Sequence, residues 1–431
     1  MEYAVVTFGC RVNQADSFDI ESAMRQAGAV PAPPDRAQLV VVNTCSVTAS
    51  ADQGARQVIR RLHRANPLAR IVVTGCYATA SRADVAALPG VVDVVSNLDK
   101  ASIVPRLLAT ATPTSADRYG EGEGACGAVL GPGLMGRTAY TLRVQTGCDE
   151  ACAYCIIPST RGPGRSRPLD DVLTSADAAR AAGFREIVLT GVHLGAWGRD
   201  LEGPLTLNDL VRSLGRRRGD VRHRLSSLEP MDCPPALVDL MAADGRFAPH
   251  FHLPLQHASD GVLARMRRPY RLDDYRRTVD HVRWRIPDAA LGTDLIVGFP
   301  GETDADHRRL TAYLESSPLT HLHVFPYSTR AGTEAARLAD HVPPPVVRER
   351  TAEVRAIGRA LVERFHRSQD GAVRRALTVD DGSVAVTDNY LKVRVPPTGS
   401  RNRWIDVRLA WSAGGFIGDV LDRPIGTAPQ A

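Results

Sequence analysis

The stretch TAYTLRVQTGCDEACAYC, residues 138–155, decides the fold of the largest part of this chain. Its first part, residues 138–144, is rich in apolar, aromatic and β-branched side chains, which predicts a strand. Three cysteines follow with the spacing C-x3-C-x2-C: Cys148, Cys152 and Cys155. Three thiolates on one tight loop can each bind one iron of a [4Fe–4S] cluster and leave the fourth iron open to another ligand. Zinc is the alternative, although zinc usually takes C-x2-C pairs and a fourth protein ligand.

The region that contains this loop alternates predicted strands and helices from residue 138 to about residue 365. Further strand candidates are 186–190, 223–227, 290–296 and 321–325, with helical patterns between them. Five or six βα units predict a partial (β/α) barrel, whose functional groups lie at the carboxyl ends of the strands.

A second set of three cysteines lies in residues 1–110, where strand-like runs again alternate with helical segments. Cys10, Cys45 and Cys76 each directly follow a predicted strand, at intervals of 35 and 31 residues. This pattern predicts a parallel α/β sheet, and ligands bind beyond the carboxyl ends of the strands in such sheets. One βα repeat between successive cysteines would bring the three thiols to one edge. We therefore predict a second iron–sulfur cluster; the alternative is three buried structural cysteines.

The remaining segments differ in composition. Residues 111–137 hold little that could form a core and predict a linker. Residues 366–431 contain short strand-like runs separated by turn signals, which predict a small antiparallel β barrel and, beyond about Ser412, a loosely held tail. The expected fold class is α/β, with an N-terminal parallel-sheet domain (1–110), a central partial barrel (138–365) and the C-terminal β module.

Composition sets broad limits on function. The formal net charge of +5 is compatible with a polyanionic partner. No apolar run approaches 18 residues and the N-terminus lacks the pattern of a signal peptide, so we expect a cytoplasmic protein without a membrane span. Eight cysteines in such a chain indicate metal ligands or reactive thiols rather than disulfides.

The C-x3-C-x2-C loop, with Tyr154 before its last cysteine, resembles the signature of the radical S-adenosylmethionine superfamily. The resemblance implies that the open iron binds the amino and carboxylate groups of S-adenosylmethionine. Electron transfer from the cluster would then cleave this cofactor to methionine and a 5′-deoxyadenosyl radical. An external one-electron donor, such as flavodoxin or ferredoxin, is implied as well.

Together the two cysteine triads resemble the methylthiotransferase family over nearly the whole chain. The segments that carry this resemblance are FGCRVNQ (8–14), NTC (43–45), TGCY (74–77), CIIP (155–158), RG (161–162), SLEP (227–230), LPLQ (253–256), RMRRPY (265–270) and VGFPGET (297–303). The C-terminal module, with TDNY (387–390), resembles the RNA-binding TRAM domain of the family. The family resemblance implies that Cys148, Cys152 and Cys155 hold the radical-generating [4Fe–4S] cluster. Cys10, Cys45 and Cys76 would hold a second [4Fe–4S] cluster that carries sulfur.

Within the family, TGVHLGAWG (190–198) and CRVNQ (10–14) resemble the subgroup that acts on threonylcarbamoyladenosine at position 37 of tRNA. The expected reaction is methylthiolation of adenosine C2. Isopentenyladenosine in tRNA and a ribosomal protein are the alternative substrates within the family. One departure is QHAS (256–259), where the family usually has Gln-Ser-Gly-Ser.

Several single residues are expected to serve these sites. The candidate contacts to S-adenosylmethionine are Tyr154, Gly191, Glu229, Gln256, Gly298 and Gly301. The candidate RNA contacts are Asn389, Tyr390, Lys392 and Arg394, because aromatic rings beside cations commonly hold single-stranded RNA. His193 is predicted to pack or to line the cofactor site, and Cys126 and Cys233 are predicted to be free thiols.

Two other classes of protein are compatible with the cysteine pattern. An iron–sulfur electron carrier would hold two clusters without cleaving S-adenosylmethionine. A zinc-stabilised RNA-binding protein would contain zinc and no [4Fe–4S] absorbance.

Overall fold

The computed structural model describes residues 1–109, 131–133, 136–412 and 414–421. Most of the predicted linker, with Cys126, lies outside these residues. The chain forms two compact units, one of residues 1–130, 146–150 and 155–164 and the other of residues 131–145, 151–154 and 165–431. The central region and the C-terminal β module thus belong to one unit, and the division into three domains stays a prediction.

The first unit is built on a five-stranded sheet in the order β2-β1-β3-β4-β5, and all neighbouring strands are parallel. The strands are β1 (Glu2–Thr7), β2 (Val30–Pro31), β3 (Leu39–Thr44), β4 (Arg70–Gly75) and β5 (Val91–Val94). The helices are α1 (Arg11–Gln26), α2 (Ala49–Ala65), α3 (Cys76–Ala80), α4 (Arg82–Ala86), α5 (Ile103–Ala109) and α6 (Ile157–Arg161), with a 3-10 turn at Lys100–Ser102. The predicted parallel sheet is confirmed.

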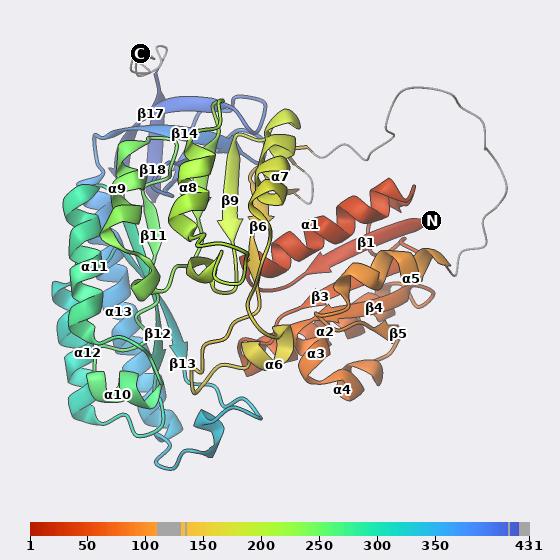
Figure 1. Cartoon of the computed structure of the whole chain (residues 1–431), viewed down its shortest axis with the longest axis horizontal. Helices are drawn as coiled ribbons and strands as arrows, with labels where there is room; N and C mark the ends of the chain where they lie inside the picture. Colours follow the sequence, from red (N-terminus) through yellow and green to blue (C-terminus); the bar gives the residue numbers. More distant parts are fainter. Residues whose placement is uncertain (110–130, 134–135, 413, 422–431) are drawn as a thin grey trace. The chain divides into compact units, whose positions relative to one another are not determined.

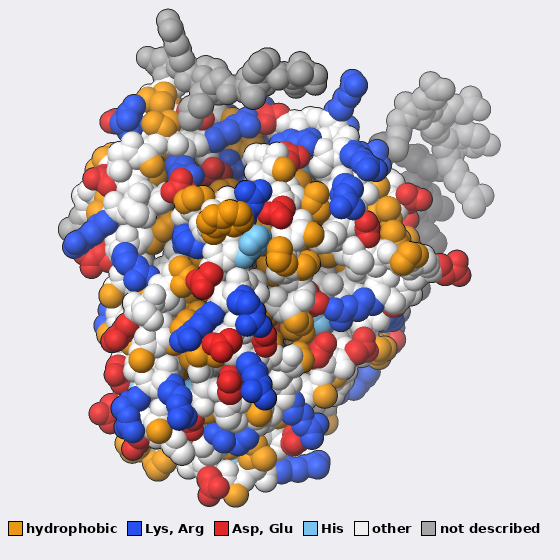
Figure 2. All heavy atoms as spheres, turned by 60° about the vertical axis from the view of Figure 1, so that its left-hand side comes forward, with side chains coloured by type: hydrophobic (Ala, Val, Ile, Leu, Met, Phe, Trp, Pro, Cys, Tyr) orange, Lys and Arg blue, Asp and Glu red, His pale blue; other side chains and the backbone are white. Residues whose placement is uncertain are grey.

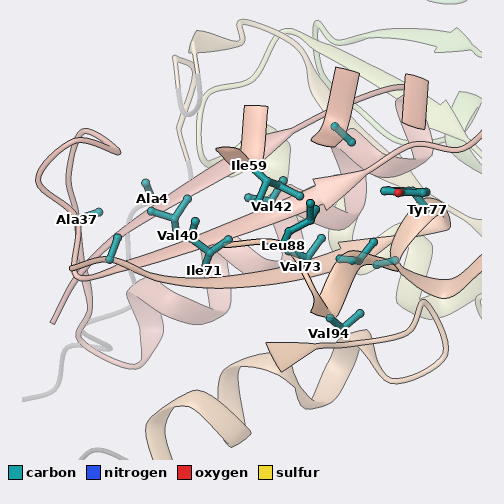
Figure 3. Close-up of a cluster of buried hydrophobic side chains, with 14 residues drawn as sticks. Ala4, Ala37, Val40, Val42, Ile59, Ile71, Val73, Tyr77, Leu88 and Val94 are labelled. Atoms are coloured by element: carbon teal, nitrogen blue, oxygen red, sulfur yellow. The ribbon is translucent and has the colours of Figure 1, made fainter. Parts of the chain in front are cut away.

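Both faces of this sheet are covered, which explains why its central strands carry runs of consecutive apolar residues, 39–42 in β3 and 71–73 in β4. On one face Val40, Val42, Ile71 and Val73 pack against Ile59 of α2, as Figure 3 shows. On the other face the intervening valines of β3 and β4 pack with residues of α1 and α5. Successive side chains of a strand point to opposite faces, so a continuous apolar run is what two covered faces require.

The second unit contains six further parallel strands in two groups, ordered β10-β9-β6 and β11-β12-β13. They are β6 (Tyr140–Arg143), β9 (Glu186–Thr190), β10 (Arg222–Leu225), β11 (His250–His252), β12 (Ala290–Val297) and β13 (His321–Pro326). Isolated parallel bridges join the two groups, for example Ser227 to His252. The predicted partial barrel is confirmed, and Figure 1 shows helices α7, α11 and α12 beside its strands.

Helices lie between these strands and after the last of them. They are α7 (Leu169–Ala181), α8 (Leu207–Gly215), α9 (Pro235–Ala243), α10 (Asp260–Arg265), α11 (Leu272–Arg285), α12 (Asp304–Ser316) and α13 (Pro344–Ser368). Short 3-10 turns lie at Leu194–Ala196, Pro230–Asp232 and Ala335–Arg337, and β7 (Gln145–Thr146) pairs with β8 (Arg165–Ser166). Thr303 and Asp306 form a capping box that fixes the start of α12 directly after the VGFPGET segment.

The C-terminal module is a closed five-stranded barrel in the order β14-β15-β16-β18-β17. Its strands are β14 (Val373–Val379), β15 (Val384–Thr387), β16 (Lys392–Arg394), β17 (Trp404–Ser412) and β18 (Gly415–Val420). Two expectations need correction. β16 and β18 pair in parallel, so the barrel is not wholly antiparallel. Residues 415–420 are not a loose tail, because β18 closes the barrel and buries Phe416 in its core.

No helix in the described part of the chain is long and apolar enough to cross a membrane. The predicted cytoplasmic location stays a prediction.

Candidate functional site

Three thiols lie at the carboxyl edge of the N-terminal sheet. Cys45 and Cys76 directly follow β3 and β4, and Cys10 lies three residues after the end of β1. The three strands are neighbours in the sheet. Cys45 and Cys76 are buried and Cys10 is exposed, which does not fit three buried structural cysteines. Because parallel strands end at the same edge, the topology brings together cysteines that are far apart in the sequence.

The thiols are close enough to affect one another's ionisation. Burial, together with the charges of Cys10 and Cys76, raises the pKa of the Cys45 thiol to about 11. A thiol in this environment is a poor anion by itself and a good ligand once a cation neutralises it, since metals bind the thiolate form. The donor set therefore fits a cluster held by three protein sulfurs.

Glycines give the cysteine loops the space they need. Gly9 and Gly75, immediately before Cys10 and Cys76, have φ angles of +90° and +103°, where side chains other than glycine are strained. A Cβ on Gly9 would lie 2.6 Å from the sulfur of Cys45, and one on Gly75 would lie 2.1 Å from the carbonyl oxygen of Thr44. The two G-C pairs thus permit close approach of backbone and sulfur at this edge.

A buried charge network lies beside the thiols. Asp16 of α1 accepts from Lys100 Nζ at 2.5 Å and from Arg161 Nη2 at 3.0 Å. Burial opposes the charge of Arg161, but Asp16 and the thiols of Cys76 and Cys10 outweigh it and hold the pKa of its guanidinium above the usual value. Sequence reasoning missed Asp16 and Lys100; the rarity of lysine in this chain was the available signal.

The first unit also contains two cysteines of the C-x3-C-x2-C loop. Cys148 N donates to the Gly162 carbonyl at 3.1 Å, and Gly147 before it has a φ of +73° with the Pro163 carbonyl where a Cβ would lie. Cys155 Sγ accepts from the backbone of Ile157 at 3.4 Å. Both thiols are partly exposed, as a ligand to an added cluster should be.

The third cysteine, Cys152, has its own surroundings in the second unit. Arg268 Nη1 lies 3.1 Å from its sulfur, and the same guanidinium pairs with Glu229 and stacks on Tyr270. Burial opposes the charge of Arg268, but Tyr154 and Glu229 hold its pKa far above the usual value. A fixed cation beside Cys152 favours the thiolate that an iron ligand requires.

The other predicted cofactor contacts are all placed near strand ends of the second unit. The Glu229 carboxylate forms an ion pair with the Arg268 guanidinium. Gly298 and Gly301 both have positive φ, but the Gly298 N–H already donates to the Glu302 carboxylate at 2.6 Å. Gly191 lies against Gln145, whose side-chain oxygen accepts from the backbone of His193.

The segment QHAS (256–259), which differs from the usual family sequence, packs into the partial barrel. Gln256 has a φ of +66° and bridges to β12 at Leu295, and His257 and Ala258 are buried. His193 is buried as predicted, with its Nε2 2.5 Å from an Asp232 oxygen. Burial raises the pKa of the thiol of Cys233, a free cysteine as predicted, to about 12, which favours the protonated form.

The predicted RNA contacts differ in their exposure. Asn389 is completely buried, and its amide donates to the carbonyl of Asp288 and to the side chain of Gln369, because the TDNY turn anchors the β barrel to the rest of its unit. Tyr390 is 45% exposed, with the Arg224 guanidinium 4.7 Å from its ring centre. Lys392 and Arg394 are exposed on β16 and stay candidates.

Charges of both signs are interspersed over the face drawn in Figure 2. Any nucleic-acid contact on this face would therefore depend on particular side chains rather than on a uniform basic surface.

Two protein-family models match this chain, and they cover the regions that hold the two cysteine triads. Residues 2–97 match a model described as Uncharacterized protein family UPF0004, and residues 142–314 match the Radical SAM superfamily. The threonylcarbamoyladenosine tRNA methylthiotransferase MtaB of Bacillus subtilis is 34% identical over 409 residues, which cover 90% of this chain and 88% of that protein. The chain belongs to the radical S-adenosylmethionine tRNA methylthiotransferase family. The family implies an enzyme that uses S-adenosylmethionine and a [4Fe–4S] cluster.

Other members of the methylthiotransferase family are similar over most of their length. The MtaB protein of Thermotoga maritima is 34% identical over 391 residues, covering 90% of this chain and 89% of that protein. The tRNA-2-methylthio-N(6)-dimethylallyladenosine synthase of Parafrankia is 36% identical over 377 residues, covering 86% and 76%. In structure, the radical S-adenosylmethionine methyltransferase TsrM of Kitasatospora setae superposes with a TM-score of 0.54 over 75% of this chain and 72% of its own, at 16% identity. This last likeness concerns the fold.

Proposed function

We propose that this enzyme transfers a methylthio group to C2 of N6-threonylcarbamoyladenosine at position 37 of tRNA. The observation that carries the proposal is the placement of Cys10, Cys45 and Cys76 at the ends of three neighbouring parallel strands, beside the Arg161 guanidinium. A radical enzyme needs only one cluster to cleave S-adenosylmethionine. A second set of three thiols in the same chain therefore supports a second task, which is to carry the sulfur.

The target hydrogen explains why no acid–base pair is needed. It lies on C2 of an aromatic ring and is not acidic, so no side chain can remove it at neutral pH. When bound, S-adenosylmethionine and the two clusters supply the radical, the methyl group and the sulfur. The residues of this chain hold these groups: six cysteines as ligands, with Arg161 and Arg268 as fixed cations beside the sulfurs.

The substrate assignment has two sources of support. The TGVHLGAWG segment resembles the threonylcarbamoyladenosine subgroup, and relatives named for that activity match about 90% of the chain. A relative named as a dimethylallyladenosine synthase is as similar in identity, so isopentenyladenosine is the second candidate substrate. We further propose that the C-terminal barrel is a TRAM domain that binds tRNA through Tyr390, Lys392 and Arg394, and that flavodoxin or ferredoxin supplies electrons.

One experiment separates these possibilities. The purified protein is reconstituted anaerobically with iron and sulfide, reduced, and incubated with S-adenosylmethionine and tRNA that carries either modified adenosine. Mass spectrometry of the nucleosides should show the methylthio product from threonylcarbamoyladenosine. About eight irons per chain are expected, as two [4Fe–4S] clusters require. Two clusters without 5′-deoxyadenosine would instead identify an electron carrier, and a methylthio product only from isopentenyladenosine would reassign the substrate.

A further inference from the structure

The sheet β11-β12-β13 carries a group of imidazoles and one carboxylate that the cysteine clusters do not use. Gly292 of β12 pairs with both His252 and His321, and Asp294 of β12 pairs with His323. Paired residues of parallel strands point to the same face, and so do residues two apart in one strand. The register therefore collects these side chains on one face: His252, His321, His323 and Asp294.

In three of these side chains, the atoms that could bind a metal ion face one another. Asp294 Oδ1 lies 3.1 Å from His252 Nε2 and 3.1 Å from His323 Nδ1. All three donor atoms lie within 4.8 Å of one another, and the rings of His252 and His323 are 5.2 Å apart. Ligand atoms that bind one ion at about 2.0–2.2 Å lie about 3–4 Å apart, and the two 3.1 Å distances from Asp294 Oδ1 fall in that range.

Neighbouring residues orient the triad. His252 Nδ1 lies 3.0 Å from the Ser227 hydroxyl, so the other ring nitrogen, Nε2, faces Asp294. Hydrogen bonding of the second ring nitrogen is the usual way in which a protein orients a metal-binding imidazole. Gly292 makes room for the row of rings, since a Cβ there would lie 2.1 Å from His321 Nε2.

The triad is accessible as well as ordered. The exposed fractions of the side chains are 13% for His252, 27% for Asp294 and 54% for His323, so the site is buried at one side and open at the other. A rigid sheet supplies the ligands, and the open side supplies an entry path. Imidazole and carboxylate donors without sulfur suit Zn²⁺ or Fe²⁺ rather than an iron–sulfur cluster.

We propose that His252, Asp294 and His323 bind one divalent transition-metal ion, separate from the two iron–sulfur clusters. Two imidazoles and one carboxylate leave coordination positions open, as in catalytic zinc sites and in two-histidine, one-carboxylate iron sites. The open positions would take water or an oxygen ligand such as a phosphate or carboxylate group. This proposal does not depend on which adenosine the enzyme modifies.

Zinc binding tests the proposal without any activity measurement. The cluster-loaded protein is equilibrated with a low concentration of Zn²⁺, separated from unbound ion, and analysed for zinc, iron and sulfide per chain. About one zinc is expected, with iron and sulfide unchanged. His252→Gln and Asp294→Asn should each weaken zinc binding by at least about tenfold, because each removes a direct ligand.

Matched controls keep this result interpretable. His281→Gln removes a histidine that also lies near a carboxylate, Asp239 at 3.6 Å, but that belongs to no group of three such side chains among the described residues. This variant should bind zinc as the original chain does. Zn²⁺ should raise the melting temperature of the original chain and of His281→Gln but not of Asp294→Asn.

The proposal is wrong if cluster-loaded protein retains no zinc, or if Asp294→Asn retains as much as the original chain while melting at the same temperature. The triad would then be a set of hydrogen bonds within the sheet.

Discussion

Arg161 Nη2 lies 3.0 Å from Asp16 Oδ2, and both side chains are almost completely buried. The contact joins the end of α6, six residues after Cys155, to the helix that begins directly after Cys10. Within the first unit, the segment after the C-x3-C-x2-C loop is thus tied by charge to the edge that carries the other cysteine triad. The same carboxylate also holds Lys100.

Removing Asp16 should destabilise the first unit strongly. Asp16→Ala leaves Arg161 and Lys100 buried without their common carboxylate, and breaking a buried pair costs about 3–5 kcal/mol. Denaturant unfolding of the variant measures this loss. Glu363→Ala, which removes the exposed partner of Arg367, should cost less than about 1 kcal/mol. Equal losses for the two variants would contradict the role given to Asp16.

Cysteine substitutions in the two triads should affect different steps of the reaction. Cys148→Ala should abolish formation of 5′-deoxyadenosine, because it removes a ligand of the radical-generating cluster. Cys45→Ala should leave that cleavage intact and stop methylthiolation, with about half of the iron lost. Iron analysis, chromatography of 5′-deoxyadenosine and nucleoside mass spectrometry measure the three quantities. Normal methylthiolation by Cys45→Ala would refute the function proposed for the N-terminal sheet.

Gly75→Ala should lower both stability and cluster content. The new Cβ would meet the Thr44 carbonyl at 2.1 Å, and the φ of +103° is strained for alanine, so a cost of about 1–3 kcal/mol is expected. Gly54→Ala is the control, because Gly54 lies in helix α2 with nothing within 4 Å of an added Cβ. That change should stabilise by up to about 1 kcal/mol. Thermal melting and iron content check both variants.

Stability should fall as the pH falls from 7 to 5. Burial lowers the pKa of His223 to about 4 from its ordinary 6.5, so the unfolded chain takes up a proton between these values before the folded chain does. The loss attributable to His223 is about 2 kcal/mol at pH 5 relative to pH 7. His223→Phe, which keeps a ring beside Phe247, should unfold with a smaller pH dependence. An unchanged dependence would show that His223 does not titrate in this range.

Lys392 and Asn389 should differ in their effects on RNA binding. Lys392→Ala removes an exposed cation from β16, so it should weaken tRNA binding. The slope of the logarithm of the binding constant against the logarithm of the salt concentration should become smaller by about 1. Asn389→Ala removes buried hydrogen bonds and should lower the melting temperature while the salt dependence stays the same. Binding titrations at several salt concentrations distinguish the two. An unchanged salt slope for Lys392→Ala would place the RNA elsewhere.

Local patterns predicted much of this molecule. The apolar runs before Cys10, Cys45 and Cys76 indicated buried parallel strands, because consecutive apolar residues are typical of strands covered on both faces. The glycine before a cysteine and the C-x3-C-x2-C spacing are also local, since they concern residues that share one loop. Such features depend on backbone geometry and survive without knowledge of the rest of the fold.

The tertiary structure alone decided the features that join distant segments. The sequence predicts a loose tail beyond Ser412, yet β18 pairs with β17 across a short turn, Ser412 to Gly415, and with β16 through closure of the barrel, a contact that no local pattern indicates. Asn389 sits in a motif that predicted RNA contact, yet packing against Asp288 and Gln369 buries it. Asp16 meets Arg161 across 145 positions, and Asp294 meets His252 and His323 only through strand register. The sequence by itself determines which residues can be ligands and which segments can form strands. Strand register and packing determine which of these residues come into contact, because register and packing depend on contacts between distant segments that no local pattern encodes.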